Sequence, residues 1–303
     1  MPSISKKHEA GVGLGCGVLA YLMWGVFPVY FKSLGSVPPL QVVAHRVVWS
    51  LLFLFLLIIV LGRSADVRTA LKSRRSLLIL MTTAFLIAAN WLIFVIAIDH
   101  AQILQASLGY FITPFFSVFL GFLFLKEHLR RMQLFGLLLA ACGVLLITVQ
   151  YGHIPWAALT LALTFSCYGL LRKIVAVDAL VGLTVETLLV APIAAGYLIF
   201  VSLNGTGSFP LPGIKINGLL MFSGIVTAVP LLLFATAARR LKLATVGFLQ
   251  YIAPTLQFLL AVLVYDELFT VSNLCSFMLI WGGICFYSVD AWLAMKMYRT
   301  GLS

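Results

Sequence analysis

Three ionisable residues stand inside long apolar runs of this sequence: His45, Arg46 and Glu186. A charged side chain at the centre of a membrane helix costs about 2.5–3.5 kcal/mol on insertion scales, so each needs a partner or a function. An arginine at such a place can hold a solute or lock a gate, a glutamate can exchange a proton, and a histidine titrates near neutrality. We therefore predict that the three residues belong to a substrate pathway.

Each of the three also has a purely structural alternative. Arg46 lies about six residues, or roughly 9 Å, from the nearer end of its apolar run, so it can also snorkel to water. Low dielectric would favour neutral Glu186 and make it proton-responsive, but a hydrogen bond to a neighbouring helix would satisfy it equally well. The two depths differ by roughly 12 Å in a core of about 30 Å, which argues against a permanent Arg46–Glu186 pair. A single membrane histidine such as His45 is more often a structural donor.

Aromatic and amide side chains at membrane depth suggest a cavity. Trp and Tyr are common anchors at the membrane interface, but Trp24, Trp91 and Tyr110 lie too deep in their runs for that role. An aromatic cavity with few charges suits neutral, zwitterionic or amphipathic solutes. The residues that we expect to line it, besides those three, are Asn90, Gln250, Tyr251 and Gln257.

Three prolines are candidate hinges. Proline lacks an N–H group, so the carbonyl four residues earlier loses its helical partner. Pro28 would free the carbonyl of Trp24, and Pro114 and Pro254 would do the same for Tyr110 and Gln250. Freed carbonyls are tolerated in a membrane where they face protein or a water-filled cavity. We therefore predict substrate contacts at these carbonyls and bending at the three prolines.

Patterns for other chemistry do not occur. The sequence has no Walker loop, no Gly-x-Ser-x-Gly and no His-Glu-x-x-His, and its five cysteines have no metal-ligand spacing. We predict no catalytic residue, metal or cofactor, and hence no enzyme. The cysteines are expected to be small buried packing residues.

Composition places most of the chain in lipid. Of its 303 residues 62% are hydrophobic and only 10% are charged, whereas a soluble domain carries about 25% charged residues. The net charge of +11 is spread over short clusters between apolar runs, which indicates the membrane surface rather than nucleic acid as the partner. A membrane helix needs about 20 apolar residues. The predicted spans are 11–31, 40–61, 76–98, 104–125, 132–149, 155–171, 180–202, 215–237, 244–264 and 271–293.

The distribution of Lys and Arg predicts the orientation. If the N-terminus is cytoplasmic, all but three of the 20 Lys and Arg residues fall in inner segments; the exceptions are Lys32, Lys215 and Arg46. Positive residues are enriched in cytoplasmic loops. Both termini are therefore expected in the cytoplasm.

The two halves of the sequence resemble each other. Pro114 and Pro254 are each followed thirteen residues later by a glutamate, Glu127 and Glu267, and each glutamate sixteen residues later by a glycine. The two glutamates are expected to cap the helices that follow them. Five spans per copy is an odd number, so the second copy must enter the membrane in the opposite direction, as in many transporters. We predict two inverted five-helix repeats, 1–150 and 151–303, in an all-α polytopic fold.

Several stretches resemble the EamA-type members of the drug/metabolite transporter superfamily and, within them, the RarD-like branch. The Pro…Glu…Gly spacing is general to EamA repeats, and the branch is indicated by six further stretches. These are Tyr-Leu-Met-Trp-Gly (21–25), His-Arg-Val-Val-Trp-Ser (45–50), Asn-Trp-Leu-Ile-Phe (90–94), Ala-Ser-Leu-Gly-Tyr-Phe-Ile (106–112), Val-Glu-Thr-Leu (185–188) and Gly-Phe-Leu-Gln-Tyr-Ile-Ala-Pro-Thr (247–255).

The resemblance covers nearly the whole chain and implies ten helices, a central cavity and export of a metabolite or drug. RarD-like proteins are described as chloramphenicol-sensitivity proteins, a label that does not identify a physiological substrate. The predicted partners are a small-molecule substrate, the lipid bilayer of the bacterial inner membrane and, as candidate coupling ions, protons. A channel and a partner-binding membrane scaffold stay open as alternatives, and so does the oligomeric state.

Overall fold

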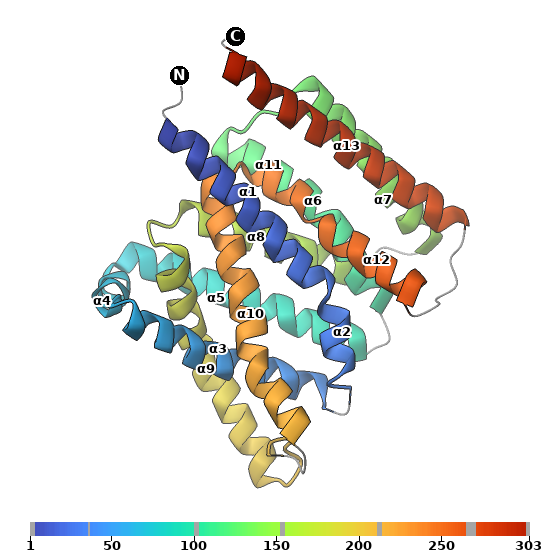
Figure 1. Ribbon diagram of the computed structural model, residues 1–303. Helices are drawn as coiled ribbons and strands as arrows, with labels where there is room; N and C mark the ends of the chain where they lie inside the picture. The colour runs from blue at the N-terminus through green and yellow to red at the C-terminus, as the bar shows by residue number, and fades with distance from the viewer. Residues whose placement is uncertain are drawn as a thin grey trace.

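The structure is a computed structural model that describes residues 4–35, 37–99, 103–151, 155–210, 214–264 and 271–300. These residues form thirteen helices and contain no strand (Figure 1). The helices are α1 (Ile4–Gly25), α2 (Phe27–Lys32), α3 (Pro39–Val60), α4 (Ser64–Lys72), α5 (Arg74–Asp99), α6 (Ile103–Leu125), α7 (Arg131–Tyr151), α8 (Trp156–Ile174), α9 (Ala179–Leu203), α10 (Ile214–Arg240), α11 (Leu243–Leu249), α12 (Ile252–Val264) and α13 (Val271–Thr300).

The predicted number of spans agrees with the structure. Within the described residues, nine helical stretches are long and apolar enough to cross a membrane, and a shorter apolar helix covers Leu274–Asp290. A helix satisfies all its backbone groups internally, which is what lipid demands. The chain is thus an all-helical, multi-pass membrane protein. The N-terminal end of α1 and the C-terminal end of α13 lie at the same end of the bundle, here called the terminal end (Figure 1).

Two predicted spans are not continuous helices. The first divides into α1 and α2 at Val26, just before Pro28. The ninth divides into α11 and α12 at Gln250 and Tyr251, just before Pro254. Because proline cannot donate to the preceding turn, both interruptions fall where the sequence loses a helical hydrogen bond. Pro114, by contrast, lies inside α6 without ending it.

The packing partners of the first five spans reappear among the last five. Helix α10 packs on α1 and α3, and α5 packs on α8 and α9. Helix α6 packs on α8, and α12 packs on α1; α3 pairs with α9. Exchanging the two halves of the chain therefore returns each of these pairs, whereas the packing of α8 on α10 has no comparable counterpart between α1 and α5.

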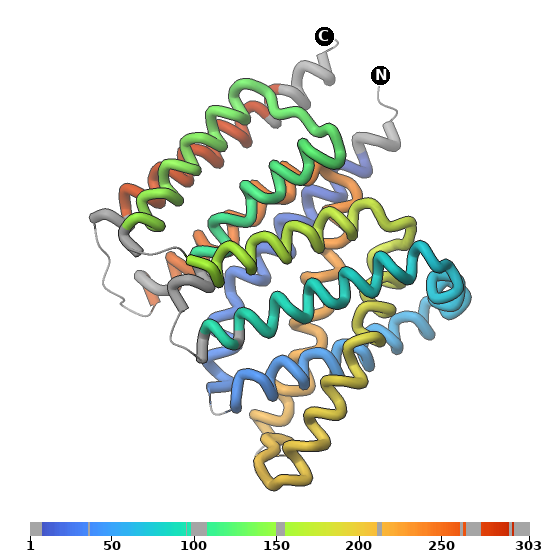
Figure 2. Tube along the Cα trace, turned by 180° about the vertical axis from the view of Figure 1, so that it is seen from behind, coloured from blue at the N-terminus to red at the C-terminus, as the bar shows by residue number. Residues whose placement is uncertain are grey.

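Helices α7 and α13 lie side by side along one flank of the molecule (Figures 1 and 2). The repeated glycines of the two halves, Gly143 and Gly283, both lie in this contact. A Cβ atom on Gly143 would stand 2.6 Å from the carbonyl oxygen of Ser276, and one on Gly283 would clash with the carbonyl of Gly136. Small residues let membrane helices approach closely, which accounts for glycine at both positions.

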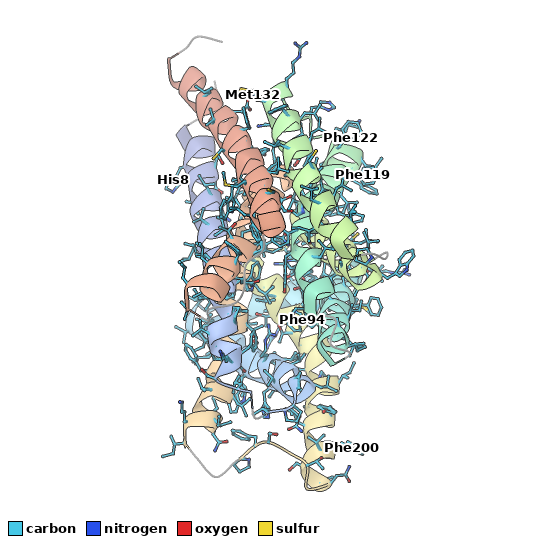
Figure 3. All side chains as sticks on the ribbon, turned by 90° about the vertical axis from the view of Figure 1, so that its right-hand side faces the viewer. His8, Phe94, Phe119, Phe122, Met132 and Phe200 are labelled. Carbon is cyan, nitrogen blue, oxygen red and sulfur yellow. The ribbon has the colours of Figure 1, made fainter. Side chains whose placement is uncertain are left out.

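Large apolar side chains cover the outside of the bundle, as lipid requires. Phe119, Phe122 and Phe200 point away from it and are more than half exposed (Figure 3). The prediction that the cysteines are buried is wrong: Cys142, Cys275 and Cys285 are exposed, and Cys16 and Cys167 are half-buried. A thiol is apolar enough for a lipid-facing position, so apolar surroundings in the sequence did not imply burial in protein.

Candidate functional site

A cavity of about 500 Å³ lies between the helices of both halves. Its walls come from α1, α3, α5, α6, α8, α10 and α12, from the α11–α12 junction and from the segment that joins α1 to α3. On α3, α6 and α8 the lining residues lie near the start of the helix, and on α5 near its end, so the cavity lies away from the terminal end. Small-molecule sites commonly enclose about 300–1,000 Å³.

Eight aromatic side chains line the cavity. Trp24, Trp91 and Tyr110 line the cavity as the sequence predicted, and Tyr21, Phe27, Phe31, Phe94 and Phe165 join them. Trp24 and Phe165 meet edge to face with ring centroids 5.8 Å apart, which holds both rings in place. The site therefore presents broad apolar faces to a bound molecule.

Arg46 is the only charged residue among those that line the cavity in the described structure. Its Nε donates a hydrogen bond to Thr227 Oγ1 at 2.8 Å. Its Cζ atom lies 5.2 Å from the ring centroid of Phe31 and 5.1 Å from that of Trp91. An arginine between two aromatic faces is held by cation–π attraction, which orients the guanidinium without neutralising it. Phe31 and Thr227 were not anticipated from the sequence.

No carboxylate neutralises Arg46 within the described side chains. Of the nine acidic residues, those with described side chains are Glu9, Asp66, Glu127, Asp178, Glu186 and Asp290. Each of these pairs with a cation other than Arg46, respectively Arg240, Arg63, Lys173, Arg63, Arg172 and Arg130. The cavity therefore carries one positive charge and no opposing charge from these groups.

Three predicted amides also line the cavity: Asn90, Gln250 and Gln257. Asn90 donates from Nδ2 to the Leu161 carbonyl at 2.9 Å and to Thr164 Oγ1 at 2.8 Å, which ties α5 to α8. The Gln250 side chain is buried at the α11–α12 junction and makes no hydrogen bond within the described structure. Gln250 thus offers both a donor and an acceptor to a bound solute.

Two of the three predicted free carbonyls find partners in the protein. The Trp24 carbonyl, released by Pro28, accepts a hydrogen bond from Gln257 Nε2 at 3.2 Å. The Gln250 carbonyl, released by Pro254, accepts one from the Ala253 N–H at 3.2 Å. Pro28 lines the cavity, whereas Pro114 and Pro254 do not. The movement of all three prolines as hinges stays a prediction.

Three predicted pathway residues lie outside the cavity. His45 is 5% exposed and packs against Phe209 with ring centroids 5.3 Å apart. Tyr251 is fully buried and donates from its hydroxyl to the Phe111 carbonyl at 3.3 Å. Helix rotation decides both placements, since each residue is adjacent in sequence to one that faces the cavity.

Glu186, the third, lies in a buried polar cluster. Thr83 donates to Glu186 Oε1 at 2.6 Å and Tyr168 to Oε2 at 3.2 Å. Arg172 forms an ion pair with Oε1 at 3.3 Å, and both residues are almost fully buried. Arg172 also donates to the Ala179 carbonyl at 3.1 Å. The arrangement matches the structural alternative for Glu186, because its oxygens are held by protein groups.

Arg172 was missed because the sequence suggested that it lay in a loop after the sixth span. Helix α8 instead continues to Ile174, and Arg172 is 0% exposed. A signal was present: Tyr168 and Arg172 are four residues apart, as are Gly182 and Glu186, so each pair shares a helix face. A Cβ atom on Gly182 would overlap the Arg172 guanidinium, so glycine makes room for the arginine.

Further ion pairs join helices at the terminal end. Arg240 Nε lies 2.7 Å from Glu9 Oε2, and Arg63 Nη2 lies 2.5 Å from Asp178 Oδ2. Hydrogen bonds to Asp66 and Asp178 raise the pKa of Arg63 above its usual value. The terminal end is thus linked by charged contacts between α1 and α10 and between α9 and the segment before α4.

The expectation that Glu127 caps the helix that follows it is wrong. Its carboxylate accepts from the N–H groups of Leu243 at 3.0 Å and Ala244 at 3.3 Å, at the start of α11 in the other half of the chain. Lys173 Nζ lies 3.7 Å from the same carboxylate. A carboxylate is favourable at any helix N-terminus that it can reach, and only the tertiary structure shows which one this is. Glu267 lies outside the described residues.

Comparison with known proteins places this arrangement in a family. The model of the EamA-like transporter family matches residues 11–149. An uncharacterized transporter of Vibrio cholerae is 46% identical over 94% of this chain and 94% of its own. The chain belongs to the EamA-like transporter family.

Other members extend the match. Protein RarD of Escherichia coli is 41% identical, covering 95% of this chain and 96% of its own. Protein RarD of Salmonella typhi is 42% identical over 95% of this chain and 97% of its own. A crystal structure at 20% identity superposes with a TM-score of 0.72 over 93% of this chain and 98% of that chain, which supports the fold. The resemblance to RarD-like drug/metabolite transporters is therefore confirmed, and the family is one of transporters rather than enzymes.

Proposed function

We propose that this member of the EamA-like family is a secondary transporter that exports a small metabolite or drug-like amphipathic solute by alternating access. The observation that carries the proposal is the aromatic cavity of about 500 Å³ enclosed by helices of both halves. Its size and apolar lining fit a drug-sized molecule with a few polar groups.

The distribution of contacts along the bundle supports two alternating states. The cavity lies away from the terminal end, whereas that end holds the Arg172–Glu186, Lys173–Glu127 and Arg240–Glu9 pairs. In our proposal both termini are cytoplasmic, so this arrangement is the state with the cytoplasmic side closed. The reverse state would require these pairs to separate.

We also propose that 1–150 and 151–303 are inverted repeats. The exchangeable packing partners of the two halves support this symmetry. Rocking one repeat against the other about a central site is a recurring way to expose the site to either side. The interruptions at Pro28 and at the α11–α12 junction, both at the cavity, are the proposed bending points.

The direct test compares metabolites inside and outside bacterial cells that overproduce the protein with those of cells lacking it. We expect one class of compound to accumulate outside only when the protein is present. Matching profiles in media of several compositions would contradict export. Reporter fusions at each terminus test the orientation: a fluorescent protein that folds only in the cytoplasm is expected to be bright at both ends.

A further inference from the structure

We infer that the solute is a singly charged organic anion with an aromatic or apolar body, whose anionic group binds the guanidinium of Arg46. The inference rests on the proposed transport function and names the substrate class of the same cavity. It differs from the neutral or zwitterionic solutes that the aromatic residues alone suggest.

The first argument is the number of unused donors on Arg46. A guanidinium carries five N–H groups in a planar fork, and one of them, on Nε, is donated to Thr227 Oγ1 at 2.8 Å. Neither terminal nitrogen has a hydrogen-bond acceptor in the described part of the chain. The remaining N–H groups have the geometry that binds a carboxylate through two parallel hydrogen bonds.

The second argument is charge balance. Every acidic side chain that the structure describes is paired with another cation, so none of these six neutralises Arg46. An isolated cation at membrane depth is costly, and a bound anion would remove that cost. With one cation and no described acidic group in the lining, the cavity favours a single negative charge and offers an ammonium group no carboxylate.

The third argument concerns orientation. A snorkelling arginine would extend its head toward water and need no fixed partners. Arg46 is instead held between the rings of Phe31 and Trp91, at 5.2 and 5.1 Å, with Nε anchored on α10. Such preorganisation reduces the cost of ordering the group on binding. Trp91 and Phe31 also place apolar surface beside the charge, where the body of an amphipathic anion would lie.

The test measures binding to the purified full-length protein in detergent by equilibrium dialysis. The probes are phenylbutyrate and naphthylacetate, each with its neutral amide, and phenylbutylamine as the cation. We expect each carboxylate to bind about 10- to 100-fold more tightly than its amide, the usual range for a charge-assisted hydrogen-bonded pair. The amine should bind more weakly than both.

Variants assign the preference to the arginine. Arg46→Gln should reduce the carboxylate preference to less than about twofold, and Arg46→Lys should retain part of it, because a lysine keeps the charge without the planar fork. Arg68→Gln, which removes an exposed cation on α4 that lies outside the cavity lining, is the matched control and should keep the full preference. Monodisperse elution and an unchanged melting temperature show that each variant is folded.

Any of three results of the dialysis experiment would overturn the inference: equal binding of carboxylate and amide, a preference that survives in Arg46→Gln, or no carboxylate binding by folded wild-type protein. A stoichiometric phospholipid that co-purifies with the wild type and is lost in Arg46→Gln would also overturn it, because the anion would then be a lipid headgroup. The proposed function fails separately. If only neutral or cationic compounds were exported, the proposed transport function would stand and the anionic substrate class would be wrong. If anions bound in an Arg46-dependent way but no compound were exported, the anion site would stand and the transport function would be wrong.

Discussion

Two arginines inside the bundle show how differently one residue type can be accommodated in a membrane. Arg172 is fully buried and forms an ion pair at 3.3 Å with Glu186, whose carboxylate also accepts hydrogen bonds from Thr83 and Tyr168. Arg46 is half-buried, lines the cavity and has aromatic rings and one threonine as neighbours. The first charge is neutralised by the protein, whereas no described acidic side chain neutralises the second, which we propose to be the charge that binds the solute. Position in a span therefore does not show whether a buried arginine has a counter-ion in the protein; the tertiary structure does.

The largest expected effect comes from breaking the buried pair. Arg172→Met leaves the Glu186 carboxylate buried and unpaired, and we expect a loss of about 3–5 kcal/mol in the free energy of unfolding. Thermal unfolding of the detergent-purified protein measures the loss. The double variant Arg172→Met/Glu186→Met should recover much of it, because two apolar groups replace two charges. If the single and double variants were equally unstable, the loss in Arg172→Met could not be assigned to the unpaired charge of Glu186.

The threonines that contact the two charged clusters offer a matched comparison. Thr83→Val removes a donor from buried Glu186 and should cost about 1.5–3 kcal/mol, the usual value for a hydrogen bond to a charge. Thr227→Val removes the acceptor of Arg46 Nε beside the cavity and should cost less in stability. It should instead weaken binding of an anionic probe. If the same melting experiment showed a larger stability loss for Thr227→Val than for Thr83→Val, the structural role would belong to the Arg46 site and not to the Glu186 cluster.

The next largest effect on stability is expected at Gly182, which lies against Arg172. An alanine methyl group at Gly182 would overlap the Arg172 guanidinium, so Gly182→Ala should cost about 1–3 kcal/mol through displacement of that group. Gly196 lies on the same helix, and a methyl group there would meet no neighbouring atom within 4 Å. Gly196→Ala should therefore be neutral or stabilising by about 0.5–1 kcal/mol. Similar melting temperatures for the two variants would show that the arginine site can relax.

A smaller effect on stability is expected at Arg63, which is more exposed than Arg172. Arg63 pairs with Asp66 and Asp178, but its side chain is 36% exposed. Arg63→Ala should change the free energy of unfolding by about 0–1 kcal/mol, and less at high salt, because water screens the pair. Asp178→Ala should cost more, about 0.5–2 kcal/mol, since Asp178 Oδ1 also accepts from the N–H groups of Leu180 and Val181 at the start of α9.

The smallest expected effect is on the pH dependence of transport. Glu186 lies outside the cavity and is held by Thr83, Tyr168 and Arg172, so Glu186→Gln should leave the pH dependence of transport unchanged. The experiment measures uptake into proteoliposomes over a range of pH in the wild type and the variant. A pH profile that flattens in Glu186→Gln would restore Glu186 as the coupling group.

The sequence could predict several of the residues that line the cavity, because their depth in an apolar run and their chemistry are local properties. Seven residues were expected in a cavity from their depth and chemistry, and the structure places all seven in its lining: Trp24, Arg46, Asn90, Trp91, Tyr110, Gln250 and Gln257. The same reasoning misplaced His45 and Tyr251, because a rotation of one residue, about 100°, turns a side chain to another helix face. It also missed Phe31 and Thr227, which have no unusual property in the sequence.

The sequence by itself determined that this chain is a multi-pass helical membrane protein, because lipid accepts only long apolar segments whose backbone groups are satisfied within the helix. It also marked three prolines where a span could bend, but the lost hydrogen bond coincides with an interruption at Pro28 and Pro254 and not at Pro114. The tertiary structure alone decided which groups meet. Glu127 caps a helix that starts 116 residues later, and Arg172 rather than Arg46 meets Glu186. Such contacts depend on how rigid helices are rotated and packed, which no local pattern specifies.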